Sequence, residues 1–311
     1  MTAPLDAPGA ALDFADVDAA FAACRERVDA ALRAICDRHL PAVVDSATAD
    51  AIRYSLLGEG KRLRPVLLLA AYAAAGGRGD ASALAAAVEV VHAYSLVHDD
   101  LPCMDDDDVR RGRPTVHRVF GAGAATAAGV AMVPLAALAA LEASRELGLP
   151  EEECGHVVRD LMRASGAGGM IGGQLLDLES EGEALSLERL ERIHRAKTGA
   201  LIAAAAVLGG RAARGGDREL DALTAYGRAV GRAFQIADDV LDVTATTDQL
   251  GKTAGRDLEL HKSTYPALLG VEGAREWAAA LVEEACAALA GAGLLTPALE
   301  HLARFAVSRR S

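Results

Sequence analysis

The chain has 311 residues, of which 51% are hydrophobic and 4% aromatic, and its formal net charge is −12. This acidic balance argues against nucleic acid as a partner, so an anionic substrate would need a local basic pocket. Abundant Ala, Leu and Val with few β-branched runs predict an all-α protein. Five scattered cysteines without Cys-x-x-Cys spacing predict neither a disulfide framework nor a zinc site, and a reducing cytoplasm is the expected location.

The periodicity of apolar residues predicts helices along most of the chain. Residues 1–16 are expected to be a loose N-terminus without the basic and apolar segments of a signal peptide, and 17–311 a single domain, because no linker-like composition appears. Helical patterns, ended by Gly or Pro in several cases, cover residues 17–40, 47–57, 66–75, 81–100, 187–208, 220–243 and 270 onward.

Two further stretches need a choice between alternatives. Residues 121–141 carry no charge, but Ala and Gly dominate them and Pro134 interrupts them, so a buried core helix is favoured over a membrane span. The Gly-rich stretch 166–173 runs straight into a helical pattern. It therefore indicates close helix packing rather than a flexible linker.

An acidic cluster at residues 98–108 ends the strongest predicted helix. Asp99 and Asp105 are six residues apart, which would place them on different faces of a regular helix. Pro102 breaks the helix, so the segment can bend until Asp99, Asp100 and Asp105 surround one cavity. The alternative is a solvated acidic cap on the helix.

A second acidic cluster follows the apolar helix over 220–243. Asp238 and Asp242 are four residues apart and share a helix face, whereas Asp239 points about 100° away. Carboxylates grouped beside apolar surroundings repel one another and need a cation to offset the repulsion. Hard divalent ions such as Mg²⁺ prefer these oxygen ligands, so the two clusters predict one metal site clamped from two sides.

Basic residues occur in short groups between and after the acidic clusters. Each group alone is typical of a solvated surface patch, but Arg and Lys also suit phosphate oxygens, and Gly60 would let the backbone approach an anion. Together with two metal-binding clusters they indicate a diphosphate site. The groups are Gly60-Lys61-Arg62-Leu63-Arg64-Pro65, Arg110-Arg111-Gly112-Arg113, Lys197-Thr198-Gly199, Lys252 and His261-Lys262.

These motifs, with Gly172-Gly173-Gln174 and Lys262-Ser263-Thr264-Tyr265-Pro266, make the chain resemble the trans-isoprenyl diphosphate synthases, most of all the bacterial farnesyl diphosphate synthases. They span most of the chain in the family's order. The resemblance implies the isoprenoid synthase fold, a single-domain antiparallel helical bundle around a central cavity. It also implies a homodimer and a trio of Mg²⁺ ions per site.

The resemblance also implies a role for each motif. Metal ligands would be Asp99, Asp105 and Asp238, supported by Asp100 and Asp242. The allylic diphosphate would be bound by Arg110, Lys197, Lys252 and Lys262, and isopentenyl diphosphate by Gly60, Lys61, Arg64, His92 and Arg111. Oxygen dipoles from the Lys197 carbonyl, Thr198 and Gln235 would stabilise an allylic cation. Asp239 would belong to the same catalytic motif. His92 has the alternative of simply packing near the site.

Product length is expected to be set below the first acidic cluster. Tyr94, beside Ser95, is five residues before Asp99 and therefore lies about 7–8 Å deeper along a helix. In the family a bulky residue there acts as a floor, so Tyr94 favours the fifteen-carbon product, farnesyl diphosphate. Ordinary core packing is the alternative for this side chain.

The chain departs from the family pattern after the first cluster. Val130 replaces a usual Asp, Ala122 a usual Glu and His261 a usual Gly, and Pro134 falls inside an expected helix. These departures keep other functions open. They are geranylgeranyl diphosphate synthesis and a non-catalytic subunit of a heteromeric synthase. A terpene cyclase is a separate alternative, which Lys61 and Arg64 disfavour, because a cyclase has no second diphosphate to bind.

Overall fold

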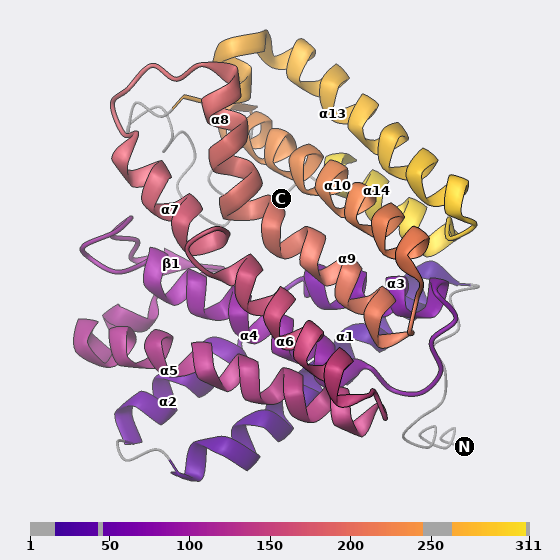
Figure 1. Ribbon diagram of the computed structural model, residues 1–311. Helices are drawn as coiled ribbons and strands as arrows, with labels where there is room; N and C mark the ends of the chain where they lie inside the picture. The colour runs from indigo at the N-terminus through magenta and orange to yellow at the C-terminus, as the bar shows by residue number, and fades with distance from the viewer. Residues whose placement is uncertain (1–15, 43–45, 245–262, 309–311) are drawn as a thin grey trace, which may run out of the picture.

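The computed structural model describes residues 16–42, 46–244 and 263–308, and helices make up nearly all of this part of the chain (Figure 1). In chain order the elements are α1 (Val17–His39), η1 (Leu40–Ala42), α2 (Ser46–Leu56), α3 (Leu63–Ala74), α4 (Ser82–Asp99), β1 (Val109–Arg110), β2 (Arg113–Pro114), α5 (Val116–Glu146), α6 (Glu151–Ser165), α7 (Met170–Glu179), α8 (Leu187–His194), η2 (Arg195–Gly199), α9 (Ala200–Ala212), α10 (Asp217–Thr244), α13 (Tyr265–Ala292) and α14 (Pro297–Ser308). The predicted all-α bundle is confirmed.

The helix ends follow local hydrogen-bonding chemistry. Asp16 caps α1, because its side chain accepts a hydrogen bond from the Ala19 N–H at 3.1 Å. Thr264 caps α13 in the same way, accepting from the Ala267 N–H at 3.3 Å. Helix α3 begins at Leu63, and Pro65 lies in its first turn, as expected, because a residue there does not need its N–H for the helix.

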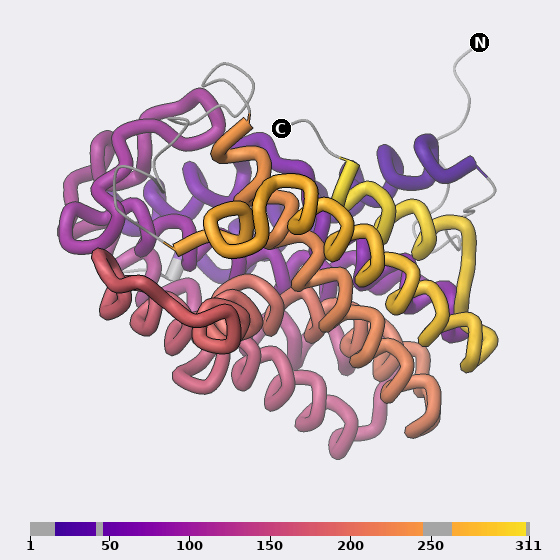
Figure 2. Tube along the Cα trace, turned by 90° about the horizontal axis from the view of Figure 1, so that it is seen from above, coloured from indigo at the N-terminus to yellow at the C-terminus, as the bar shows by residue number. Residues whose placement is uncertain are grey.

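Helices α4 and α10 are the two central helices of the bundle. Val88 and Val91 of α4 and Tyr226 of α10 have no exposed surface. α4 packs on α3 and α5, while α10 packs on α9 and α13. Seen from above, α10 and α13 run side by side (Figure 2). The two acidic clusters sit at the C-terminal ends of α4 and α10, with η2 and α9 packed against α10.

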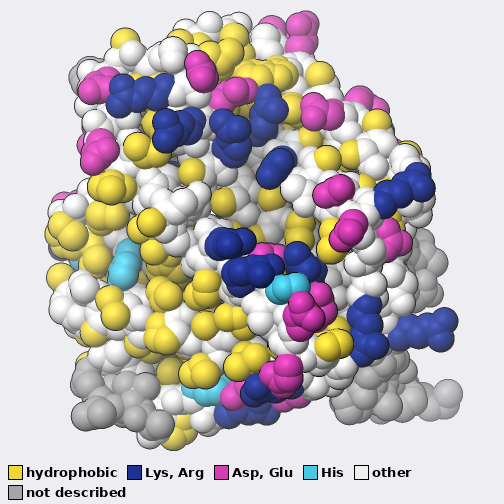
Figure 3. All heavy atoms as spheres, in the orientation of Figure 1, with side chains coloured by type: hydrophobic (Ala, Val, Ile, Leu, Met, Phe, Trp, Pro, Cys, Tyr) yellow, Lys and Arg dark blue, Asp and Glu magenta, His cyan; other side chains and the backbone are white. Residues whose placement is uncertain are grey.

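The long helix α5 is buried on one face only. Gly121, at φ 83°, separates its first turn from the rest, and its inner face packs on α2, α4 and α6. By length and composition it could cross a membrane, yet 44% of its most apolar window is buried inside the protein. The prediction of a buried core helix therefore holds for the inner face of α5 only. On the outer face Val119, Val130 and Leu138 are exposed, and hydrophobic side chains gather there at the lower left of Figure 3.

A two-stranded hairpin interrupts the helices between α4 and α5. Val109 pairs with Pro114 and Arg110 with Arg113. The two turn residues, Arg111 and Gly112, have φ of 53° and 71°, the left-handed conformation that a two-residue hairpin turn requires. The hairpin sends Arg110 and Arg111 toward different partners.

Candidate active site

The first acidic cluster bends back on itself directly after α4. The Asp105 N–H donates to the Asp99 carbonyl at 2.9 Å, and the Asp106 N–H donates to the Leu101 carbonyl at 3.2 Å. The bend expected at Pro102 therefore brings Asp99 and Asp105 together. Burial, with the neighbouring carboxylates, raises the pKa of Asp99 from 3.8 to about 6 despite the nearby Lys197 ammonium.

Asp100 pairs with the hairpin. Its carboxylate accepts a hydrogen bond from Arg110 Nε at 2.6 Å, and a second nitrogen of Arg110 reaches Asp107 at 3.1 Å. Burial raises the pKa of Asp100 to about 6, although Arg110 opposes the shift. In this structure Arg110 therefore offsets the charge of the acidic cluster.

The second acidic cluster is tied to a π-helical turn. Thr198 lies in η2 and its hydroxyl donates to Gln235 Oε1 at 2.7 Å. Gln235 Nε2 donates to Asp239 at 2.9 Å, and the other oxygen of Asp239 accepts the Tyr265 N–H at 3.0 Å. Asp239 is 3% exposed, so its contacts orient Gln235 and the start of α13. Single π-turns of this kind are frequent at functional sites.

Asp238 and Asp242 lie on α10 one and two turns beyond Gln235. Asp242 is buried and Asp238 half-buried. Their shared helix face agrees with the four-residue spacing. Gln235, at the start of this face of α10, bonds to Thr198. The face is therefore attached to the π-turn that also carries Lys197.

The side chain of Lys197 lies between the first acidic cluster and the π-turn to which Gln235 of the second cluster is bonded. Its ammonium donates to Asp177 of α7 at 2.6 Å. Burial disfavours the charged amine, but Asp177, Asp99 and Asp105 outweigh it and raise the pKa of Lys197. The side chain therefore stays cationic between α4, α7 and η2.

Asp177 is a site residue that the sequence analysis does not single out. The available signal was its place three residues after Gln174, on the same helix face as that residue of the glycine motif.

Glycines let two helices approach the π-turn closely. A methyl group added at Gly173 of α7 would lie 2.2 Å from the backbone nitrogen of Lys197. One added at Gly231 of α10 would lie 2.8 Å from the Gly199 Cα. No side chain fits at either contact. The prediction of close helix packing at the glycine motif is confirmed at Gly173.

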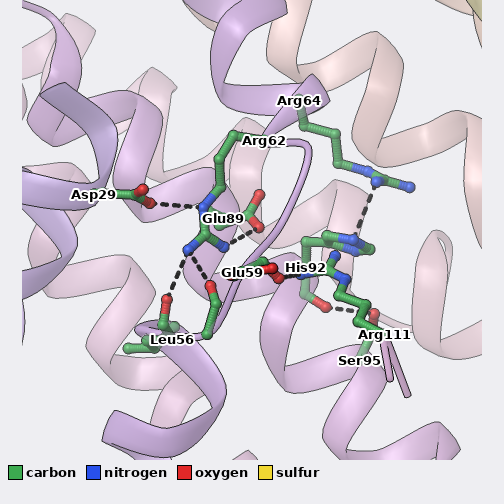
Figure 4. A network of polar contacts seen from close by, with 10 residues as sticks. Asp29, Leu56, Glu59, Arg62, Arg64, Glu89, His92, Ser95 and Arg111 are labelled. Carbon is green, nitrogen blue, oxygen red and sulfur yellow. Dashed lines mark hydrogen bonds and ion pairs between the residues drawn. The ribbon is translucent and has the colours of Figure 1, made fainter. Parts of the chain in front are cut away.

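A basic group on α3, α4 and the hairpin (Figure 4) lies near the first acidic cluster, because Arg111 interacts electrostatically with Asp100. Arg64 lies 3.3 Å from His92 Nε2. Burial and the positive field of Arg64 and Arg111 hold the pKa of His92 well below its usual range, so the ring is neutral and accepts from Arg64. Arg111 donates to the Glu59 carbonyl at 2.9 Å, and a side chain at Gly60 would collide with it. Lys61 is exposed next to them.

Arg62, in the middle of the same motif, points the other way. It is 3% exposed, in the left-handed conformation at φ 50°, and pairs with Glu89 at 2.9 Å and Asp29 at 2.8 Å (Figure 4). It also donates to the Leu56 and Gly58 carbonyls. Arg62 therefore holds the loop that presents its neighbours.

Tyr94 is fixed in the core below Asp99. It is 2% exposed, and its hydroxyl donates to the Ser165 carbonyl at 3.2 Å. Its ring packs edge-on against the His98 ring, with 5.9 Å between the ring centroids. Burial raises the pKa of Tyr94 to about 12. Ser95 is half-buried and bonds within its own helix, to the His92 carbonyl at 2.8 Å.

The departures on α5 lie away from these groups. Ala122, Val130 and Pro134 are all exposed on its outer face, Val130 by 62%. Lys252, His261 and Lys262 lie outside the described residues.

The donor set suits magnesium bound together with a ligand. Within the described ranges, no three acidic, His or Cys side chains are close enough to hold an ion by themselves. The two acidic clusters supply oxygen ligands only, which fits Mg²⁺ completed by phosphate and water oxygens. A hollow of about 580 Å³ on the outer end of α6, lined by Arg159, Arg163 and the turn at 166–168, contains none of the predicted site residues.

Comparison with known proteins agrees with this geometry. The chain matches the polyprenyl synthetase family over residues 45–292. It is 47% identical over 264 residues to geranylgeranyl pyrophosphate synthase 9 of Arabidopsis thaliana, covering 84% of this chain and 72% of that protein. Among solved structures, an FPP/GFPP synthase from Zymomonas mobilis superimposes with a TM-score of 0.78 at 36% identity, covering 93% of this chain and 100% of that one.

Geranylgeranyl pyrophosphate synthetase from Pyrococcus horikoshii superimposes with a TM-score of 0.79 at 31% identity, covering 93% and 98% of the two chains. The chain therefore belongs to the polyprenyl synthetase family, the trans-isoprenyl diphosphate synthases.

Proposed function

We propose that this trans-prenyltransferase makes geranylgeranyl diphosphate, adding isopentenyl diphosphate to allylic diphosphates up to twenty carbons. The observation that supports the reaction is the position of Lys197: Asp99 and Asp105 of the first acidic cluster stabilise its ammonium, and the neighbouring Thr198 of the same π-turn bonds to Gln235 of the second cluster. The names of the curated relatives at 46–48% identity support the twenty-carbon product over the farnesyl product expected from the sequence.

The reaction would begin with ionisation of the allylic diphosphate. Asp99, Asp105 and Asp238, supported by Asp100 and Asp242, would hold magnesium, which would neutralise the diphosphate and make it a better leaving group. Arg110 and Lys197, and by resemblance Lys252 and Lys262, would bind the diphosphate oxygens. The C1–O bond breaks with its electron pair going to the diphosphate. The Thr198 hydroxyl oxygen, the Lys197 carbonyl and the Gln235 amide would face the resulting cation.

Isopentenyl diphosphate would occupy the neighbouring basic group. Arg64, Arg111 and Lys61 supply cationic donors, and neutral His92 keeps the Arg64 guanidinium oriented. The isopentenyl double bond donates its electron pair to the allylic C1 and forms the new C–C bond. A proton then leaves to the released diphosphate, so charge and atoms balance without a nucleophilic Ser or Cys.

Farnesyl diphosphate is the second candidate product, and Tyr94 favours it. Its ring is fixed by Ser165 about 7–8 Å below Asp99, where a growing chain would meet it. A curated relative is named as the large subunit of a heterodimeric geranylgeranyl pyrophosphate synthase, so a partner-dependent enzyme also remains to be separated by experiment.

We also propose that the protein is a homodimer, as the resemblance implies. The exposed apolar residues Val119, Val130 and Leu138 on α5 offer a surface for a second copy. Light scattering should give twice the mass of 32.1 kDa, and Val130→Lys should shift the protein toward the monomer, with Leu268→Lys as a control on another exposed apolar side chain. A monomeric wild type contradicts the proposal.

Product analysis tests the proposed function. The purified protein is incubated with Mg²⁺, labelled isopentenyl diphosphate and dimethylallyl, geranyl or farnesyl diphosphate in turn. A twenty-carbon end product supports the proposal, and a fifteen-carbon product supports the second candidate. Turnover of farnesyl diphosphate without consumption of isopentenyl diphosphate would indicate a cyclase. No turnover in a folded protein would indicate a subunit that needs a partner.

A further inference from the structure

Gln174 is a buried amide that the catalytic roles above leave unused. It is 6% exposed, and neither its Nε2 nor its Oε1 has a hydrogen-bond partner within the described part of the chain. An amide buried in this way lowers the stability of the free protein. Gln235, in contrast, has both ends paired, by Thr198 and Asp239. Buried polar groups are normally satisfied, so the pair of unmet atoms in Gln174 points to a ligand.

The position of Gln174 along α7 places it at a defined depth. Helix α7 begins five residues after Ser165, whose carbonyl accepts the Tyr94 hydroxyl at the proposed floor. It reaches the level of the Lys197 ammonium at Asp177, which accepts a hydrogen bond from it. Gln174 precedes Asp177 by three residues, so it shares that helix face and lies about 4.5 Å deeper. The preceding residue of the motif, Gly173, packs α7 against the Lys197 backbone.

The depth selects the part of the substrate that meets this amide. In the proposed function, the allylic end of the prenyl chain would lie directly below the diphosphate, and the C1–O bond would break there as positive charge develops. An amide has a donor and an acceptor at one end, whereas a hydrocarbon tail offers neither. A neutral amide oxygen stabilises the developing positive charge through its dipole. A carboxylate, in contrast, could form a covalent bond to the cation.

We propose that Gln174 is a further catalytic residue, whose Nε2–H bonds the leaving diphosphate oxygen and whose Oε1 faces the allylic carbon. As the C1–O bond breaks, the electron pair moves to the oxygen that accepts from Nε2, and the charge on the allyl group faces Oε1. This inference rests on the proposed function, because it requires an allylic diphosphate in the site.

Two variants test the role, Gln174→Met and Gln174→Leu, which remove the amide and keep the volume similar. The measurements are the Tm of the metal-free protein, the increase in Tm with Mg²⁺ and an unreactive geranyl thiodiphosphate, and kcat with the KM for isopentenyl diphosphate. We expect Tm of the free protein to stay level or rise, because an unmet amide is removed. The ligand-induced increase should shrink, and kcat should fall about 100-fold with little change in KM. Gln235→Met, which breaks existing hydrogen bonds, should lower Tm of the free protein.

The outcomes separate this inference from the proposed function. A wild type that neither binds the analogue nor consumes isopentenyl diphosphate overturns the proposed function itself. An active wild type with unchanged kcat in both variants overturns only the role of Gln174. A fall in Tm of the free protein in both variants, with the ligand-induced increase intact, would show that Gln174 acts in packing and would also overturn the inference.

Discussion

Gly173 gives a sharp test of how the site is held together. It lies on α7 against the π-turn. An alanine methyl there would lie 2.2 Å from the backbone nitrogen of Lys197 and 2.6 Å from its Cα. Ordinary contact begins at 3.4 Å, so helix and turn must separate by about 1.2 Å. Both obstacles are backbone atoms and cannot rotate away. The separation would stretch the 2.6 Å pair between Asp177 and Lys197 and shift the neighbouring Thr198.

We expect two measurable effects of Gly173→Ala. Overpacking should lower the free energy of unfolding by about 1–3 kcal/mol, which thermal or urea denaturation measures. A displacement of about 1 Å at positioned groups should lower kcat about 100-fold, measured with labelled isopentenyl diphosphate. Gly168→Ala is the matched control, because nothing lies within 4 Å of the added methyl. If Gly173→Ala retains wild-type kcat and stability, close packing at the π-turn does not hold the site.

Three further predictions concern charge, folding and product length. Burial raises the pKa of Asp99 and Asp100 to about 6, so the metal-free protein should lose stability as pH rises from about 4 through 6. The variants Asp99→Asn and Asp100→Asn should each flatten this dependence of Tm on pH. Arg62→Met leaves Glu89 buried without this partner and should cost about 3–5 kcal/mol in denaturant titrations; partial recovery is expected on adding Glu89→Met, and no recovery would argue against the pair. Tyr94→Ala should lengthen the end product seen by chromatography, and an unchanged profile would remove its role as a floor.

Much of the fold and of the two acidic clusters follows from the sequence alone. Apolar periodicity places the main helices within a few residues of their observed ends. The bend at Pro102 and the four-residue spacing of Asp238 and Asp242 follow from helix geometry, because both depend only on local covalent structure. The roles of single residues rest on resemblance to a family, because local sequence patterns do not assign a substrate to a side chain.

Other features depend on long-range packing that no local pattern encodes. The π-turn over Arg195–Gly199 keeps the composition of a helix, so periodicity alone runs through it. Arg62 and Arg64 are alike in the sequence, yet one turns into the core and the other toward His92. The pairing of Lys197 with Asp177 joins separate helices. The outer face of α5 is apolar and exposed. The composition of the helix could not predict this, because it does not say which face another helix covers.

A double-mutant cycle on the two acidic clusters tests the central claim that they form one site. Asp99→Asn, Asp238→Asn and the double variant are compared by kcat at saturating Mg²⁺, with circular dichroism as the check on folding. Residues that act as a unit lose activity non-additively. We predict that each single variant loses at least about 100-fold and that the double variant loses little more than the worse single variant. Multiplied losses in the double variant, or a silent single variant, would show that the clusters do not act on one substrate.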